Sequence, residues 1–234
     1  MYKRALIKLS GEALACANGN GIDFDKVGKV VEQIKKVVES GVQVGIVIGG
    51  GNFWRGRQGR DMNRSTADYM GMLATAINSL GMQDSLIHAG IKAKVLTALG
   101  ITSVGEPFNQ QNAVKYLEEG YVVIFACGTG NPYFSTDTGA ALRAAEIGAD
   151  VLLLAKNVDG IYDSDPNVNK NAVKYDELSY DKVLADNLKA MDATAIALAR
   201  DFAIEIVAYG KNEPHGLKRI LNGEKLGTVV KKLK

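Results

Sequence analysis

Small residues with hydrogen-bonding groups follow several apolar segments of this chain. Ser10 and Gly11 follow one such segment, Gly49 to Gly51 end another, and the stretch CGTGNPYFSTDT, from Cys127 to Thr138, follows a third. Backbone N–H groups at such turns can approach an anion closely, and the N-terminus of a following helix adds partial positive charge. The sequence therefore predicts phosphate binding at these turns.

Charged side chains beside the same turns could act on a bound phosphate, whereas the two histidines are poorly placed for catalysis. His88 is expected at a helix end, and His215 follows Pro214 in a late turn. Phosphoryl transfer to an acceptor that is already an anion needs no general base, because positioning and charge neutralisation supply most of the catalysis. A phosphate monoester, with a second pKa of about 6, is such an acceptor. The candidate side chains are Lys8, Arg55, Asp68, Asp137, Asp165 and Asp192.

The familiar phosphate-binding motifs do not fit this sequence. No GxxxxGK[ST] run occurs, which argues against a P-loop enzyme. Trp54 and Tyr133 stand where the third glycine of a dinucleotide-binding motif would be, so a Rossmann-type site is disfavoured.

Strand and helix patterns alternate along the chain, and they must position these turns. Continuous apolar runs predict strands at 5–7, 42–48, 122–126, 151–155 and 204–208, with an edge strand at 228–230. Helical spacing predicts helices near 27–38, 69–80, 109–119, 138–147 and 190–202. This alternation indicates an α/β fold with a mostly parallel sheet covered on both faces. The turns after Leu9, Ile48, Cys127 and Asn157 should then gather along one edge of the sheet.

Composition narrows the class of protein further. The chain has 234 residues, 47% of them hydrophobic and 23% charged, with a formal charge of +2 that gives no reason to expect nucleic-acid or membrane binding. No apolar run approaches the roughly 20 residues that a membrane span needs. Cys16 and Cys127 lack metal-site spacing and are expected to be free thiols in a reducing compartment, which predicts a cytoplasmic protein.

Five segments together resemble the bacterial uridylate kinases, a branch of the amino-acid-kinase superfamily. They are KLSGEAL (Lys8–Leu14), VIGGGNFWRG (Val47–Gly56), MNRSTADYMGMLAT (Met62–Thr75), GTGNPYFSTD (Gly128–Asp137) and VDGIYDSDP (Val158–Pro166). The resemblance covers essentially the whole chain. It implies a three-layer α/β/α sandwich formed by one domain over 1–234, divisible into an acceptor lobe of about 1–150 and an ATP lobe of about 151–234.

The resemblance also implies an activity: a transferase that moves a phosphoryl group reversibly from ATP to UMP, giving ADP and UDP, in pyrimidine nucleotide biosynthesis. The implied catalytic residues are Lys8, Arg55, Asp137 and Asp192. Those implied to bind ATP are Lys8, Leu9, Ser10, Gly11, Gly51, Arg55, Asn157, Tyr162 and Asp165. Those implied to bind UMP are Gly50, Asp68, Thr129, Gly130, Asn131, Pro132, Tyr133, Phe134, Ser135 and Thr136.

Several of these roles have a chemical rationale. Asn131 carries both the donor and the acceptor that a uracil edge requires, and Asp68 would accept hydrogen bonds from ribose hydroxyls. Asp137 would organise the phosphates and Mg²⁺, which no side chain is expected to bind directly, or it could simply cap a helix. Asp192, expected within an apolar helix, would need a partner and is assigned the catalytic lysine.

By the same resemblance the protein would be a homohexamer built as a trimer of dimers, with UTP as feedback inhibitor. GTP is a candidate activator, because Cys16–Gly21 lies where the family has a variable segment near its GTP site. Two other functions stay open on this fold. One is an acetylglutamate or aspartate kinase, and the other is a non-catalytic, ATP-binding metal-oxoanion storage protein.

Overall fold

A large, mostly parallel sheet forms the centre of the molecule. The computed structural model describes residues 2–55 and 61–233. Within them nine strands pair in the order β4-β3-β5-β2-β1-β6-β10-β11-β9, and β11 runs antiparallel to β10. The strands are β1 (Arg4–Leu9), β2 (Gln43–Ile48), β3 (Ala93–Thr97), β4 (Glu106–Pro107), β5 (Val122–Ala126), β6 (Val151–Lys156), β9 (Glu177–Leu178), β10 (Glu205–Gly210) and β11 (Thr228–Val230).

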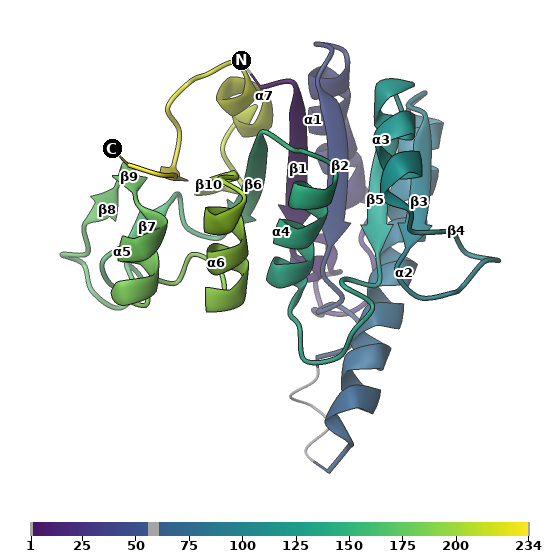
Figure 1. Cartoon of the computed structure of the whole chain (residues 1–234), viewed down its shortest axis with the longest axis horizontal. Helices are drawn as coiled ribbons and strands as arrows, with labels where there is room; N and C mark the ends of the chain where they lie inside the picture. Colours follow the sequence, from purple (N-terminus) through teal and green to yellow (C-terminus); the bar gives the residue numbers. More distant parts are fainter. Residues whose placement is uncertain (1, 56–60, 234) are drawn as a thin grey trace.

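Helices cover both faces of this sheet, as Figure 1 shows. One face packs against α1 (Phe24–Val38), α2 (Arg64–His88) and α7 (Gly216–Leu221). The other packs against α3 (Gln110–Glu118), α4 (Thr136–Glu146), α5 (Tyr180–Ala185) and α6 (Ala193–Asp201). A 3₁₀ turn, η1 (Gly11–Leu14), follows β1, and a separate hairpin pairs β7 (Ile161–Tyr162) with β8 (Lys174–Tyr175). The predicted three-layer α/β/α sandwich is therefore confirmed.

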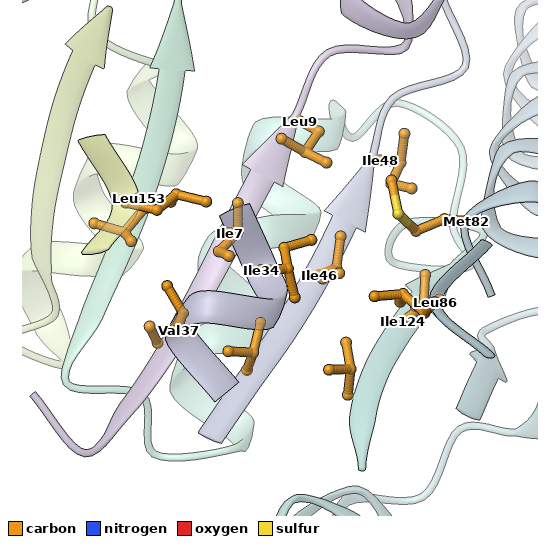
Figure 2. Packing of buried hydrophobic residues seen from close by; sticks show 14 of the residues in the cluster. Ile7, Leu9, Ile34, Val37, Ile46, Ile48, Met82, Leu86, Ile124 and Leu153 are labelled. Carbon is orange, nitrogen blue, oxygen red and sulfur yellow. The ribbon is translucent and has the colours of Figure 1, made fainter. Parts of the chain in front are cut away.

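Alternation along the central strands divides the core into two. In β1, Ile7 faces the α1–α2 side and Leu6 faces the α3–α6 side, as successive strand residues must. Figure 2 shows Ile7 and Ile46 of adjacent strands beside Ile34 of α1, and Ile124 of the next strand beside Leu86 of α2. Burial of a side chain of this size stabilises the fold by about 1.5–3 kcal/mol, so the central strands are firmly held from both faces.

The predicted helices differ from the observed ones mainly at their ends. α2 begins before the predicted 69–80 stripe and ends after it, because Asn63 caps its start and its interior glycines are tolerated. α4 begins at Thr136 with Ser135 as its cap, and α6 begins at Ala193 with Asp192 as its cap. The predicted edge strand at 228–230 is a strand but is not the edge, because the two-residue β9 pairs outside it.

Four of the strands end at the predicted turns. β5, β2, β1 and β6 are consecutive and parallel in the sheet, so their carboxyl ends meet at one side. The turns after Leu9, Ile48, Cys127 and Asn157 gather there as expected. The fold thus brings segments from residues 8 to 157 into one region.

Candidate functional site

The described residues form several cavities along this edge of the sheet, and we name three of them by their linings. The loop cavity, about 510 Å³, lies between the Gly50–Gly51 turn, α2 and the loop after β5. The lysine cavity, about 430 Å³, contains Lys8 and Asp137. The hairpin cavity, about 360 Å³, lies beside β7 and shares Lys156 and Val158 with the lysine cavity. Each volume is within the range of roughly 300–1,000 Å³ typical of small-molecule sites.

The loop cavity is lined largely by small and polar groups. The loop after β5 winds tightly at its base, because Cys127, Gly128, Gly130 and Tyr133 all have positive φ angles. The lining consists of Gly50, Gly51, Trp54, Arg64, Ala67, Asp68, Gly71, Met72, Thr75, Gly128, Thr129, Phe134, Ser135 and Thr136.

Asp68 joins α2 to this loop. Its carboxylate accepts hydrogen bonds from Arg64 Nε at 2.8 Å and from the Tyr133 backbone N–H at 2.8 Å. The Arg64 guanidinium also lies 5.7 Å from the centre of the Tyr133 ring. The Asp68 side chain is 15% exposed, whereas that of Arg64 is 62% exposed. Asp68 therefore sets the position of the loop as well as facing the cavity.

The first turn of α4 separates the loop cavity from the lysine cavity. Ser135 and Thr136 line the former, and the next residue, Asp137, lines the latter. The Ser135 hydroxyl accepts from the Thr138 N–H at 3.0 Å and caps the helix, so the capping role considered for Asp137 belongs to Ser135. The positive end of an 11-residue helix thus faces the junction of two cavities, where it favours anions.

Lys8 and Asp137 form the charged centre of the lysine cavity. Lys8 Nζ lies 2.7 Å from Asp137 Oδ1, and the two side chains are 22% and 25% exposed. Lys8 is the penultimate residue of β1 and alternates with Ile7, so it lies on the face of the sheet that α4 covers, and Asp137 is the second residue of α4. The pair fixes an ammonium group where a phosphate in this cavity would reach it. The rest of the lining is Ser10, Glu12, Ala13, Leu154, Ala155, Lys156, Asn157, Val158, Ala190 and Lys211.

Asp192 is paired differently from the prediction. Among the described residues its carboxylate accepts from the hydroxyls of Ser135 and Thr138, the latter at 2.9 Å, and from the Ala195 N–H at 2.9 Å. The expected lysine partner was wrong, because Asp192 caps α6 instead of lying inside a helix, and hydroxyls satisfy its charge. Its place is behind the α4 turn, where it ties α4 to α6.

Lys156 links the lysine and hairpin cavities, and sequence reasoning gave it no role. Its ammonium group donates to the carbonyls of Lys189 at 2.8 Å and Ala190 at 2.7 Å. Burial lowers the pKa of Lys156, and the neighbouring Asp137 partly offsets this shift. Its position at the end of a buried strand was the available signal, since a core-facing lysine is rare.

The hairpin cavity contains the expected Tyr162 and Asp165. The Tyr162 hydroxyl donates to Asp159 Oδ1 at 2.6 Å, which raises the Tyr162 pKa and, with Lys174, lowers that of Asp159. Asp165 Oδ1 accepts from the Asn167 N–H at 2.9 Å and closes a turn. Tyr162 and Asp165 thus line a cavity that shares Lys156 and Val158 with the cavity of Lys8.

Other predicted residues lie outside the cavity linings. The Leu9 side chain is in the core and its carbonyl accepts from Gly49 N–H, so only its backbone borders the edge. Arg55 is exposed and pairs with Glu12, which lines the lysine cavity. Gly56, the last residue of its motif, lies outside the described residues. Gly11, Gly130, Asn131, Pro132 and Tyr133 border the linings without belonging to them, and the Tyr133 side chain is 69% exposed.

The arrangement can place two anionic ligands against one helix N-terminus. A ligand extending from the hairpin cavity through the lysine cavity would bring its anionic end to Lys8. A second anion in the loop cavity would meet Ser135, Thr136 and the Gly50–Gly51 turn. No cluster of three or more His, Cys, Asp or Glu side chains that could hold a metal occurs in 2–55 and 61–233. No helix in those ranges is long and apolar enough to cross a membrane.

Comparisons with known proteins show which family and which solved structures this chain resembles. The model of the amino acid kinase family matches residues 3–207. The crystal structure of UMP kinase from Bacillus anthracis is similar, with 39% identity, coverage of 98% of this chain and 96% of that one, and a TM-score of 0.95. That of UMP kinase from Ureaplasma parvum shows 40% identity, 99% and 100% coverage, and a TM-score of 0.93. Uridylate kinase from Archaeoglobus fulgidus shows 27% identity, 97% and 99% coverage, and a TM-score of 0.76.

Proposed function

This chain belongs to the amino acid kinase family and, within it, to the UMP kinases, and we propose that it transfers the γ-phosphoryl group of ATP to UMP. The observation that carries the proposal is the first turn of α4. Thr136 lines the loop cavity while Asp137, paired with Lys8, lines the lysine cavity. Two cavities that meet at one helix N-terminus suit a donor and an acceptor that both carry phosphate.

We propose that ATP lies in the hairpin and lysine cavities. Tyr162 and Asp165 border the end that would hold the adenosine, and Lys8, Ser10 and Lys156 border the end that would hold the phosphates. UMP would occupy the loop cavity, with its phosphate at Ser135 and Thr136 and its ribose toward Asp68. Thr129 and Asn131, at the loop, would meet the uracil edge.

The reaction needs no general base. An oxygen of the UMP phosphate attacks the γ-phosphorus, a new P–O bond forms, and the bond to the ADP oxygen breaks, so the leaving group carries the electron pair away. Lys8, held by Asp137, and the positive end of α4 lie where they would stabilise the charge on the transferring group.

Mg²⁺ is the cofactor that this chemistry implies. The Asp137 carboxylate is partly exposed in the lysine cavity, and Mg²⁺ usually binds one or two carboxylates together with substrate phosphates and water. We propose that Mg²⁺ enters with ATP and that Asp137 is the nearest side chain to it. When bound, the ion neutralises charge on the phosphate oxygens.

We also propose assembly into a homohexamer and regulation by UTP and GTP, as the family resemblance implies. An exposed apolar stripe along α2 supports association with a second copy: Tyr69, Leu73, Ile77 and Leu80 are each at least 40% exposed. The loop cavity is where UTP would compete with UMP, and Cys16–Gly21 is the segment to test for a GTP response. The two cysteines are free thiols, which suits the cytoplasm.

The test is ADP formation from MgATP with UMP, CMP, dUMP, acetylglutamate and aspartate assayed in parallel. The proposal predicts fast turnover with UMP. Turnover with an amino acid instead would assign a same-fold amino-acid kinase. A folded protein that binds ATP and turns over no acceptor would indicate the storage function.

A further inference from the structure

Two buried asparagine side chains lie directly behind the Gly49–Gly51 turn. Asn52 follows the turn and is 2% exposed, and Asn78 comes from the middle of α2 and is 1% exposed. Their side-chain amides bond reciprocally, with Asn78 Nδ2 to Asn52 Oδ1 at 2.7 Å and Asn52 Nδ2 to Asn78 Oδ1 at 2.9 Å. We call this the amide pair.

The remaining N–H groups of the amide pair hold backbone carbonyls. Asn78 Nδ2 donates to the Gly49 carbonyl at 2.7 Å, and Asn52 Nδ2 donates to the Gly21 carbonyl at 2.8 Å. All four side-chain N–H groups therefore have acceptors. A buried amide is costly unless its hydrogen bonds are satisfied, and Asn78 lies on the buried side of α2 that also carries Met82 and Leu86.

The carbonyl that Asn78 holds determines the direction of the next peptide N–H. Because a trans peptide is planar, fixing the Gly49 carbonyl toward Asn78 points the Gly50 N–H the opposite way. Gly50 and Gly51 then line the loop cavity. A Cβ on Gly50 would lie 2.7 Å from the Gly71 carbonyl oxygen, so the turn is already pressed against α2 and has little freedom to move.

The same carbonyl also borders the turn after β1. A side chain on Gly11 would clash with the Gly49 carbonyl and with Asn52 Oδ1, and the Gly49 N–H donates to the Leu9 carbonyl at 2.9 Å. The amide pair therefore lies beneath two glycine turns at once, one beside the lysine cavity and one on the loop cavity.

We propose that Asn78 is a positioning residue for phosphoryl transfer. It acts through Gly49, fixing the Gly49–Gly51 turn so that the Gly50 N–H is held for the phosphoryl group passing between the two cavities. This inference rests on the proposed function and adds a residue of α2 to it.

The test compares three variants by steady-state kinetics, thermal melting and UMP titration. Asn78→Leu keeps a side chain of similar size but removes the hydrogen bond to the Gly49 carbonyl. Asn52→Leu/Asn78→Leu replaces both partners by apolar groups, which can be nearly neutral for stability. The matched control is Ser79→Ala, the next residue of α2, whose buried hydroxyl donates to the Thr75 carbonyl within the same helix. Trp54, the single tryptophan, lines the loop cavity and reports UMP binding by its fluorescence.

The expected result is a fall in kcat of about 10²-fold for Asn78→Leu, since misplacing a catalytic group by about 1 Å costs this much. KM for UMP and ATP should change less than about threefold, because the side chains that line the cavities are intact. The double variant should have a higher melting temperature than Asn78→Leu but the same low kcat. Ser79→Ala should have a lower melting temperature than the wild type and an unchanged kcat.

Two outcomes would overturn the inference: a near-normal kcat in a folded Asn78→Leu, or recovery of kcat together with stability in the double variant. If Asn78→Leu does not fold, the double variant alone decides by its kcat. Wild-type protein that is inactive with UMP would instead refute the proposed function, so the two failures are distinguishable.

Discussion

The loop cavity and the lysine cavity adjoin each other at the first turn of α4 but differ in the groups that shape them. The lysine cavity is organised by fixed charges, the Lys8–Asp137 pair and the half-buried Lys156. The loop cavity is organised by backbone geometry, with glycines at the β2 turn and a wound loop tied to Asp68. Changes in the lysine cavity should therefore alter the chemical step or the binding of ATP, whereas changes at the loop should alter the recognition of UMP.

Removal of the central charge should have the largest effect. Lys8→Ala is expected to lower kcat on the order of 10²–10³-fold, since it deletes a preorganised positive charge at the transferring group. The measurement is steady-state kcat with MgATP and UMP, together with thermal melting. Lys94→Ala is the matched control. Lys94 Nζ lies 2.8 Å from Glu106 Oε1, and neither residue lines the three cavities. A Lys8→Ala variant that keeps most of its activity would contradict the charge-based account of the lysine cavity.

A change at Asp68 should act on UMP instead. Asp68→Asn is expected to raise KM for UMP roughly 10- to 100-fold, as hydrogen bonds to a charged group contribute about 1.5–3 kcal/mol. It weakens the bonds that hold Arg64 and the Tyr133 N–H, with little change in KM for ATP. Asp84→Asn, on the same helix and largely exposed, serves as control. Equal rises in KM for UMP and KM for ATP would show that Asp68 does not act on UMP alone, and would contradict the assignment of the two cavities to different nucleotides.

Lys156 should affect ATP and stability in different ways. Lys156→Met is expected to raise KM for ATP about tenfold through loss of one charge-assisted contact. Lys170→Met, an exposed lysine outside the linings of both cavities, is the control. A rise in KM for UMP with an unchanged KM for ATP would show that Lys156 does not belong to the ATP site.

The lowered pKa of Lys156 also predicts a pH dependence of stability. The folded state binds this proton less readily than the unfolded chain, whose usual pKa is 10.5. The resulting penalty is fully present below the folded pKa and is lifted as the pH rises from there toward 10.5. Wild-type protein should therefore gain stability relative to Lys156→Met between neutral pH and about pH 10, measured by denaturant unfolding. A constant difference would mean that burial does not shift this pKa.

The smallest effect is expected at the loop tip. Asn131→Ala should raise KM for UMP about 2- to 10-fold, as expected for one neutral hydrogen bond, and leave KM for ATP unchanged. Asn131 is exposed, and its amide lies 3.4 Å from the Thr129 carbonyl, so its loss should barely affect stability. Asn171→Ala, exposed and outside the cavity linings, is the control. If Asn131→Ala discriminates between UMP and CMP as well as the wild type does, Asn131 does not recognise uracil.

Much of the fold could be predicted because local and tertiary preferences agree in its centre. The apolar runs of β1, β2, β5 and β6 have no alternative to burial on both faces, so their parallel arrangement and the meeting of their turns were predictable. β3 (AKVLT) was missed because a five-residue run after a helix carries little periodicity of its own. The short β4 and β7–β9 have even less, and their pairing depends on tertiary contacts.

The site was predicted unevenly for a related reason. Glycine turns and capping residues are visible in sequence, whereas partners distant in sequence are not. Asp192 was correctly judged to need a partner, yet the hydroxyls of Ser135 and Thr138 lie more than 50 positions away. Asn78 is one of three buried polar residues of α2, with Thr75 and Ser79, and only its contact with the Gly49 carbonyl reveals a role.

The most direct test of the account is whether the two cavities can be filled together. UMP binding is measured by calorimetry with and without a saturating, non-hydrolysable ATP analogue and Mg²⁺. One UMP per chain should bind in both cases, because UMP is proposed to occupy the loop cavity and the analogue the lysine and hairpin cavities. Loss of UMP binding in the presence of the analogue would contradict it, since both nucleotides would then compete for one site.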